Sequence, residues 1–378
     1  MIHYFDNCAT TKIDDEVLGI ISKYQSEVYF NPSARSNHSL QVANDLANAR
    51  EQTAMLLGAF GKEIYFTSGG TESDNIGIFG SVRAKSGNIV ATASEHSAVY
   101  NALMQLQNKG YEIRLAKVLS DGHIDIDDFA SKVDQNTLLA CFMHVNNETG
   151  AVNDVKKIHD SVKSVNAKTI TFSDGVQAVG KVPVDLHALG VDIYTMSGHK
   201  IHAGKGTGVL YVKNGVRVNP IVYGGGQEFG IRSGTEYVGG AIALPVALNK
   251  AVVALKTNAQ KFCDYKQKIR ESLADIPDWR ENCTENCSPS IMSLAFADIK
   301  GEVLLRMMED DGVIVGTGSA CSSKNKQSRI AKVINLPIRF SEGLIRISFS
   351  RLTTDEDIAA LTQSLPKCVA SLRKTMLG

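Results

Sequence analysis

The sequence predicts an α/β protein with a largely parallel sheet, followed by a smaller second unit. Across residues 62–211 short apolar runs alternate with helix-like segments, which is the pattern of parallel strands joined by helical crossovers. A chain of 378 residues is also too long for one ordinary core, so we expect a large and a small domain. After residue 240 the pattern changes to a long apolar helix.

Six apolar runs are the candidate strands of the large sheet. They are residues 63–66, 88–92, 138–144, 169–173, 191–196 and 208–212. Residues 98–106 and 155–165 have helical spacing and are candidate crossover helices. In the second unit the candidate strands are 292–297, 313–315 and 344–348. Ligands of such sheets bind where strands end and loops begin, so we expect the functional site among the polar residues that follow these runs.

Composition argues against several classes of protein. Forty Lys and Arg residues balance forty Asp and Glu residues, so we expect no direct binding of nucleic acid. The N-terminus lacks the basic and apolar regions of a signal peptide. The longest apolar stretch, residues 239–255, is interrupted by Pro245, Asn249 and Lys250, which predicts a buried helix and no membrane span. Seven scattered cysteines, an odd number, fit a reducing, cytoplasmic location.

Two residues at predicted strand ends are candidates for cofactor chemistry. Lys200 ends the small and polar segment 197–200, and a lysine there can form an imine with a cofactor aldehyde. Asp174 follows another predicted strand, where a carboxylate can pair with a pyridinium nitrogen. Asp174 could instead be a helix cap, with Gln177 completing a capping box. Lysines beside glycines are most often solvated loop residues, so neither residue decides the function alone.

Two glycine-containing segments are candidate phosphate sites. Residues 66–72 run from a predicted strand into a predicted helix, where free N–H groups and the helix dipole suit a phosphate. Residues 204–207 suggest a nucleotide alternative. A P-loop requires Gly-x4-Gly-Lys-Ser/Thr, whereas this sequence has His199 and Gly206 at the relevant positions. The spacing therefore excludes a P-loop ATPase.

Eight motifs spread in order over nearly the whole chain resemble those of cysteine desulfurases. They are residues 4–11, 31–33, 67–75, 95–96, 144–150, 197–200, 224–235 and 318–321. The resemblance implies a fold-type I transferase dependent on pyridoxal 5'-phosphate (PLP). Its large domain, residues 13–255, would hold a mainly parallel seven-stranded sheet, and residues 1–12 and 256–378 would form a smaller α+β domain. It also implies a homodimer that takes L-cysteine and passes sulfur to an acceptor protein.

The resemblance further implies roles around the cofactor ring. Lys200 would be the Schiff-base lysine and would move the proton at the substrate Cα. Asp174 would pair with the ring nitrogen, and His96 would stack on the ring face and take part in catalysis. Asn147 and Gln177 would bond to the ring hydroxyl.

Other implied roles concern the phosphate and the substrate. The implied phosphate ligands are Gly70, Thr71, Ser197, His199 and, from the second subunit, Thr235. Arg346 would clamp the substrate carboxylate, with Asn31 nearby. The chemistry is sound, because an arginine can hold a carboxylate through two parallel hydrogen bonds.

Cys321 separates this chain from other enzymes of the same fold. It lies in a run of small, polar residues, 316–323, which suits a thiol that must enter a site and then present sulfur outside it. Every charged residue between Asp311 and Glu342 is basic, and nearby positive charge favours the thiolate. The resemblance implies that Cys321 takes sulfur as a persulfide while alanine leaves. The polar loop resembles the long-loop group, of NifS and IscS type.

The remaining cysteines receive simpler interpretations. Cys283 and Cys287 form a Cys-x3-Cys pair, but a zinc site needs further ligands and no suitable companion pair is evident. We therefore expect no metal site and interpret both as surface-loop thiols. Cys8 stands where the family commonly has alanine, so we expect a small packing residue.

Three alternatives stay open. A selenocysteine lyase would use the same residues, and an aminotransferase would not depend on Cys321. A non-enzymatic sulfur relay or scaffold would have no use for Lys200, Asp174 and His96 together.

The sequence departs from the family at Gly175, where alanine is frequent, and ends without the extension by which housekeeping enzymes contact their scaffold. We therefore expect a dedicated pathway, such as DNA phosphorothioation or tRNA thiolation, more than general iron-sulfur cluster assembly.

Overall fold

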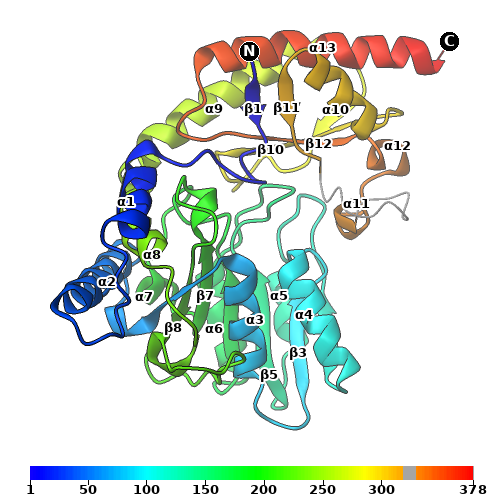
Figure 1. Cartoon of the computed structure of the whole chain (residues 1–378). Coiled ribbons are helices and arrows are strands. Elements are labelled where there is room, and N and C mark those ends of the chain that lie inside the picture. Colours follow the sequence, from blue (N-terminus) through cyan, green and yellow to red (C-terminus); the bar gives the residue numbers. More distant parts are fainter. Residues whose placement is uncertain (318–328, 378) are drawn as a thin grey trace.

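The large unit is built on one seven-stranded sheet (Figure 1). The computed structural model describes residues 1–317 and 329–377. In spatial order the strands are β2 (Ile64–Thr67), β8 (Gly208–Val212), β7 (Ile193–Ser197), β6 (Ile170–Asp174), β5 (Thr137–Met143), β3 (Asn88–Thr92) and β4 (Glu112–Ala116). β8 is antiparallel to β2 and β7, and the other pairs are parallel. This confirms the predicted α/β class and the mainly parallel seven-stranded sheet.

Helices cover both faces of this sheet (Figure 1). They are α1 (Asp15–Ser26), α2 (Asn37–Leu56), α3 (Gly70–Ser81), α4 (Ser97–Asn108), α5 (Ile126–Ser131), α6 (Val155–Val165), α7 (Leu186–Leu189) and α8 (Val238–Val253). Alternate residues of β5 enter two different apolar clusters: Ala140 and Phe142 lie in one, and Leu139 and Cys141 in the other. Burial on both faces is why these strands are continuous apolar runs in the sequence.

The second unit joins both ends of the chain (Figure 1). Its strands are β1 (His3–Phe5), β9 (Trp279–Glu281), β10 (Ile291–Phe296), β11 (Val313–Val315) and β12 (Leu344–Ser348), and its helices are α9 (Leu255–Ser272), α10 (Gly301–Asp310), α11 (Arg329–Val333), α12 (Ile338–Ser341) and α13 (Asp355–Leu377). β1 pairs in parallel with β11, and Phe5 packs in one apolar cluster with Phe262 and Leu361. This packing supports a domain division after residues 12 and 255, which stays a prediction.

The apolar stretch after residue 238 is the core helix α8. Gly240, Ala243, Leu244 and Leu248 are buried in it. Among the described residues no single helix is long and apolar enough to cross a membrane, although α8 and α9, which meet at a bend of 60°, satisfy length and composition together.

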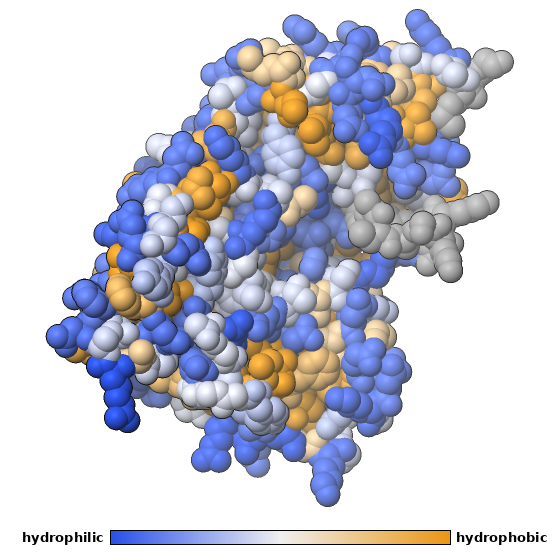
Figure 2. Space-filling model, in the orientation of Figure 1, coloured by the Kyte–Doolittle hydropathy of each residue, from blue (hydrophilic) through white to orange (hydrophobic). Residues whose placement is uncertain are grey.

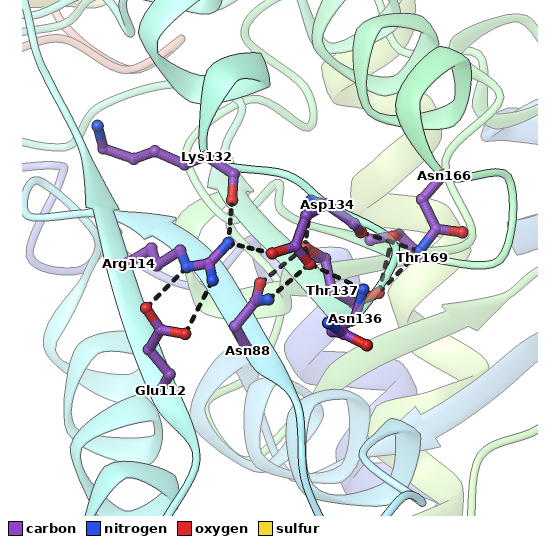
Figure 3. Close-up of polar contacts among 9 residues, drawn as sticks. All are labelled: Asn88, Glu112, Arg114, Lys132, Asp134, Asn136, Thr137, Asn166 and Thr169. Carbon is purple, nitrogen blue, oxygen red and sulfur yellow. Dashed lines mark hydrogen bonds and ion pairs between the residues drawn. The ribbon is translucent and has the colours of Figure 1, made fainter.

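Polar side chains tie together the amino ends of β3, β4, β5 and β6 (Figure 3). Asp134 accepts hydrogen bonds from Asn88 Nδ2 and Arg114 Nη1, both at 2.8 Å. Thr137 Oγ1 donates to Asn88 Oδ1 at 2.7 Å, and Thr169 Oγ1 donates to the Thr137 carbonyl at 2.8 Å. Arg114 lowers the pKa of the Asp134 carboxyl to about 2. The carboxylate in this network is therefore charged and paired at neutral pH.

Some elements were predicted to the residue and others were missed. β3, β8, α6, β11 and β12 have the predicted bounds. β4 was missed because it is an edge strand in which only Ala116 is buried, so it lacks the apolar run of a central strand. β9, a three-residue strand, has no fully buried position.

Candidate active site

One cleft gathers almost all of the predicted cofactor-binding residues. It lies at the carboxyl ends of the strands and has a cavity volume of about 120 Å³. The predicted residues that line it are Gly70, Thr71, His96, Asn147, Asp174, Gln177, Ser197, His199 and Lys200. They come from five strand ends because β2, β3, β5, β6 and β7 all run in one direction and so end at one edge. Thr235 is the predicted cofactor residue that does not line it.

Lys200 ends the short 3-10 helix η2 (Gly198–Lys200) after β7. Its Nζ donates hydrogen bonds to the carbonyl oxygens of Cys8, at 2.5 Å, and Ala9, at 2.7 Å. Burial, followed by the nearby Lys181 ammonium, lowers the pKa of the Lys200 amine to about 8. An amine with this pKa has a substantial neutral fraction near neutral pH, which is the nucleophilic form.

Asp174 ends β6 and faces the cleft within a group of buried acids. Its Oδ1 accepts from the Val176 N–H at 2.9 Å, and Asp74 accepts from Thr195 Oγ1 at 2.7 Å. Burial raises the pKa of both carboxyls. Glu95 lies nearby, and burial raises its pKa to about 7. A positive ring nitrogen entering the cleft would restore the charged form of Asp174.

His96 caps α4 through its Nδ1, which accepts from the Ala98 N–H at 3.2 Å. Its ring is exposed to the open cleft. Desolvation by the surrounding protein nevertheless lowers the pKa of the imidazole, and Lys200 and Arg329 add to this effect while Asp174 opposes it. The neutral ring is suited to lie against an aromatic cofactor.

The opposite end of the cleft has the features of an anion site. Gly70 and Thr71 begin α3, and the first N–H groups of a helix have no partners within it. A Cβ at Gly70 would lie 2.8 Å from Val176 Cγ2, so a side chain here would crowd the cleft. Ser197 is buried beside this helix start. Burial lowers the pKa of the His199 imidazole to about 4, so it acts as a neutral hydrogen-bonding group.

Asn147 and Gln177 line the cleft, but the Gln177 side chain already has partners. Its Nε2 donates to the Cys8 carbonyl at 3.0 Å, and its Oε1 accepts from Lys181. Residues 176–180 form turns, and Asp174 accepts from the Val176 N–H instead of starting a helix. The alternative of a helix with a capping box is therefore wrong, because residues 175–180 are not helical and Gln177 Oε1 accepts from Lys181.

Three predicted residues lie outside the cleft lining. Arg346 is buried, and its guanidinium donates to the Asn147 carbonyl at 2.8 Å and to Asp6 Oδ1 at 2.6 Å. Its Nε has no partner among the described residues. Asn31 is exposed, and its side chain accepts from the Ser33 N–H. Thr235 is exposed and lines a neighbouring cavity.

Cys321, Lys324 and Lys326 lie outside the described residues. Arg329 is the first described residue after them, and it is not a free charge. Its guanidinium donates to the carbonyls of Ala93 and Glu95, at 2.8 and 2.5 Å, and lies 4.6 Å from the centre of the Tyr100 ring. Arg329 therefore braces the segment that carries His96.

Sequence reasoning missed a buried pair behind Asp174. The Tyr194 hydroxyl and His144 Nδ1 are hydrogen-bonded at 2.7 Å, and the His144 N–H donates to the Asp174 carbonyl at 2.8 Å. A Cβ at Gly175 would fall inside the Tyr194 ring, so the tyrosine explains why glycine stands where alanine is frequent. The departure at Gly175 was the available signal, but its partner is 19 residues away on another strand.

The other cysteine interpretations have mixed outcomes. Cys8 is buried in a small apolar cluster with Val145 and Ile291, which confirms it as a packing residue. Cys283 is also buried, with only 2% of its surface exposed. Its interpretation as a surface-loop thiol is wrong, because the loop folds inward against α9.

Comparison with known proteins identifies the family. The family model described as aminotransferase class-V matches residues 3–361. The chain belongs to this family. A cysteine desulfurase of Nostoc sp. is 38% identical over 376 residues, covering 98% of this chain and 93% of that relative. The structure of a NifS-like protein superposes with a TM-score of 0.93 at 31% identity, covering 98% and all of the two chains. SspA in complex with cysteine matches with a TM-score of 0.82 at 28% identity, covering 92% and 98%.

One trio in the cleft also has the spacing of a metal site. Ligand atoms of Asp74, His96 and Asp174 lie within 4.8 Å of one another, the one such group found among the described residues. All three residues line the cleft described above. The expected absence of a metal stays a prediction.

Proposed function

We propose that this protein is a PLP-dependent cysteine desulfurase, which converts L-cysteine to L-alanine and takes the sulfur as a persulfide on Cys321. The observation that carries the proposal is the single cleft in which Lys200, Asp174 and His96 meet. Relatives named cysteine desulfurase over nearly the full length of the chain support it.

The residues of the cleft fit PLP. Asp174 is a buried carboxyl suited to a ring nitrogen, Lys200 is an amine suited to an aldehyde, and the start of α3 is suited to a phosphate. When bound, the cofactor supplies an electron sink that weakens bonds at the substrate Cα. We assign its phosphate to Gly70, Thr71, Ser197 and His199.

The chain's own groups would then orient the substrate and move protons. Lys200 is the group that takes and returns the proton at Cα, since its lowered pKa lets both of its forms exist near neutral pH. Arg346 binds the substrate carboxylate, and its contacts with Asp6 and the Asn147 carbonyl hold the guanidinium in place. The Cys321 thiolate attacks the substrate sulfur, so an S–S bond forms and the Cβ–S bond breaks. Protonation at Cβ and Cα completes alanine, and the sulfur stays on Cys321 as a persulfide.

Two variants test these assignments. Lys200→Ala should lose alanine formation, and borohydride reduction should no longer fix the cofactor to the chain. Lys213→Ala, which changes a half-buried lysine that donates to the Gly190 carbonyl, is the matched control and should keep both properties. A borohydride-fixed cofactor in the Lys200 variant would contradict the assignment.

Cys321→Ser should still bind cofactor and L-cysteine but should carry no persulfide. Mass spectrometry of the loaded wild type locates the extra sulfur. Sulfur found on any other cysteine would contradict the role of Cys321. An aminotransferase would be unaffected by this variant, so the same experiment separates that alternative, and comparing turnover on cysteine and selenocysteine separates a selenocysteine lyase.

We also propose a homodimer in which Thr235 reaches the partner's phosphate site. Thr235 belongs to a segment, residues 221–237, that exposes apolar side chains, with Tyr223 at 82% and Phe229 at 70%. Such exposed side chains gathered in one segment favour a protein interface. A buried bidentate ion pair with Arg50, at 2.6 and 2.7 Å, anchors Glu228 in the same segment.

The dimer has a direct test. Tyr223→Glu should convert the protein to monomers in sedimentation experiments, with loss of activity. Val253→Glu changes a residue that is 75% exposed at the end of α8, and it should remain dimeric. A fully active wild-type monomer would exclude the shared site.

Two further proposals concern the cellular location and the protein that accepts the sulfur. We place the enzyme in the cytoplasm, an assignment supported by six free cysteines among the described residues. We propose a dedicated sulfur pathway, with an acidic acceptor face steered by Lys324 and Lys326. Reversing these two charges should slow sulfur transfer to that acceptor and leave alanine formation unchanged. Faster transfer to a general iron-sulfur scaffold would exclude the idea.

A further inference from the structure

Cys283 and Cys287 lie together in a loop outside the active-site cleft. The loop joins β9 to β10, and the side chains of Cys283 and Cys287 interact with each other, while the Cys283 thiol also donates to the Glu285 carbonyl at 3.5 Å. Cys283 is buried, whereas Cys287 is half-exposed. The pair therefore has one thiol open to small molecules and a second thiol directly behind it.

A buried cation faces the more exposed sulfur. Lys266 on α9 is 3% exposed, and its Nζ lies 3.7 Å from Cys287 Sγ and donates to the Ser288 carbonyl at 2.8 Å. Two further charges are close, Glu281 and Arg270, but they neutralise each other in an ion pair of 2.8 Å. Lys266 thus has no ion-pair partner among the described residues, and its positive charge beside the Cys287 sulfur favours the thiolate.

The backbone anchors the loop on both sides of the pair. Asn282 N–H donates to the Ser293 carbonyl at 2.9 Å. On the other side of the pair, Cys287 forms a β-bridge with Ala151, and the Ser288 N–H donates to the Gly150 carbonyl at 2.7 Å. Both ends of the loop are thus held, which limits how far the two cysteines can separate.

We propose that Cys283 and Cys287 form a redox-active dithiol, in which Cys287 reacts with hydroperoxides and Cys283 closes an intramolecular disulfide. The Cys287 thiolate attacks the peroxide, so an S–O bond forms, the O–O bond breaks and hydroxide leaves. The Cys283 thiol then attacks the sulfenic sulfur, so an S–S bond forms, the S–O bond breaks and water leaves with the thiol proton. The two thiols lose two electrons, and hydrogen peroxide is reduced to water.

The contacts of Cys287 also predict its acidity. The hydrogen bond from Cys283, followed by the Lys266 ammonium, lowers the pKa of the Cys287 thiol, while burial and Glu281 oppose the shift. Cys368 provides the opposite case within the same protein. It is buried beside Asp311, and burial raises the pKa of its thiol.

The first test needs no substitution in the pair. The Cys321→Ser holoenzyme is treated with iodoacetamide at pH 7, and each cysteine is followed by peptide mass spectrometry. The half-exposed Cys287 should react at least about fivefold faster than the exposed Cys263, because its thiolate fraction is higher, and Cys368 should hardly react. Faster reaction at Cys263 than at Cys287 would overturn the proposal.

The second test follows the oxidation itself. One equivalent of hydrogen peroxide should yield a peptide containing the Cys283–Cys287 disulfide, which dithiothreitol reverses. In Cys283→Ser, dimedone should instead label Cys287 as a sulfenic acid. Lys266→Met should slow reaction at Cys287 at least about fivefold while Cys263 is unchanged. A peroxide-treated protein whose Cys283 and Cys287 stay reduced would refute the dithiol.

Discussion

The two edges of the large sheet use charge in opposite ways. At the amino edge, Asp134 is bound by Arg114 and Asn88, and its pKa falls to about 2 because of the arginine (Figure 3). At the carboxyl edge, burial raises the pKa of Asp174 and Asp74. The acid at the amino edge is thus charged and paired, whereas the acids at the carboxyl edge are buried and have raised pKa values.

The difference separates structure from function. A paired surface carboxylate contributes to holding strands in register, whereas a buried acid without a cation costs stability and is kept where a ligand supplies the charge. The face drawn in Figure 2 is largely hydrophilic, with apolar patches between charged side chains. The chemistry is therefore found by following perturbed carboxyls at strand ends, and not by counting charges on the surface.

The largest expected effect is a loss of activity when a carboxylate at the carboxyl edge of the sheet is removed. Asp174→Asn should lower alanine formation about 10²–10³-fold, because it removes the negative charge opposite the ring nitrogen. Asp134→Asn is the matched change at the other edge and should leave turnover unchanged. Steady-state kinetics with cofactor saturating distinguishes the two, and equal losses in both variants would erase the proposed contrast.

The next effect concerns Glu95, whose folded pKa of about 7 lies above its ordinary value of 4.5. A raised pKa means that the folded state binds the proton more tightly, so the stabilisation is complete below pH 4.5 and is lost as pH rises through 7. Glu95→Gln should therefore stabilise the protein by up to about 3 kcal/mol at pH 8. The gain should vanish near pH 4 in denaturant unfolding, and a gain independent of pH would contradict the shift.

A smaller effect tests the packing of Tyr194 against Gly175, the residue after Asp174. Gly175→Ala should cost about 1–3 kcal/mol, because the added methyl group would overlap the Tyr194 ring. Tyr194→Met removes that ring, so the double variant should recover much of the loss. Thermal unfolding and turnover both report the rescue. If Tyr194→Met gave no recovery, the explanation of Gly175 by its neighbour would be wrong.

The smallest effect belongs to the amino edge. Arg114→Met should lower Tm slightly at pH 7 and leave turnover unchanged, since Asp134 keeps its bonds to Asn88, Asn136 and Thr137. The lowered pKa of Asp134 means that its stabilisation is present above its ordinary value of 3.8 and is lost as pH falls toward 2. The Tm difference should shrink over that range in calorimetry.

Local patterns were sufficient for the fold class and for most of the cleft. The central strands are apolar because both of their faces are buried, so their runs are visible in the sequence, and the residues after them meet because parallel strands end at one edge. Lys200, Asp174 and His96 could be assigned from strand ends and from motifs in the family's order. The roles of Asn31, Arg346 and Thr235 rest on the resemblance alone.

Three features of the site depend on contacts between segments that are distant in the sequence, and only the tertiary structure decided them. Tyr194 fills the space above Gly175, Arg329 braces the segment before His96, and Lys266 faces Cys287 from another helix. None of these pairs has a periodic or adjacent pattern in the sequence. The sequence determined which groups are present and at which edge of the sheet they gather. Packing determined their protonation and partners, because burial and the distance to the nearest charge exist only in the folded chain.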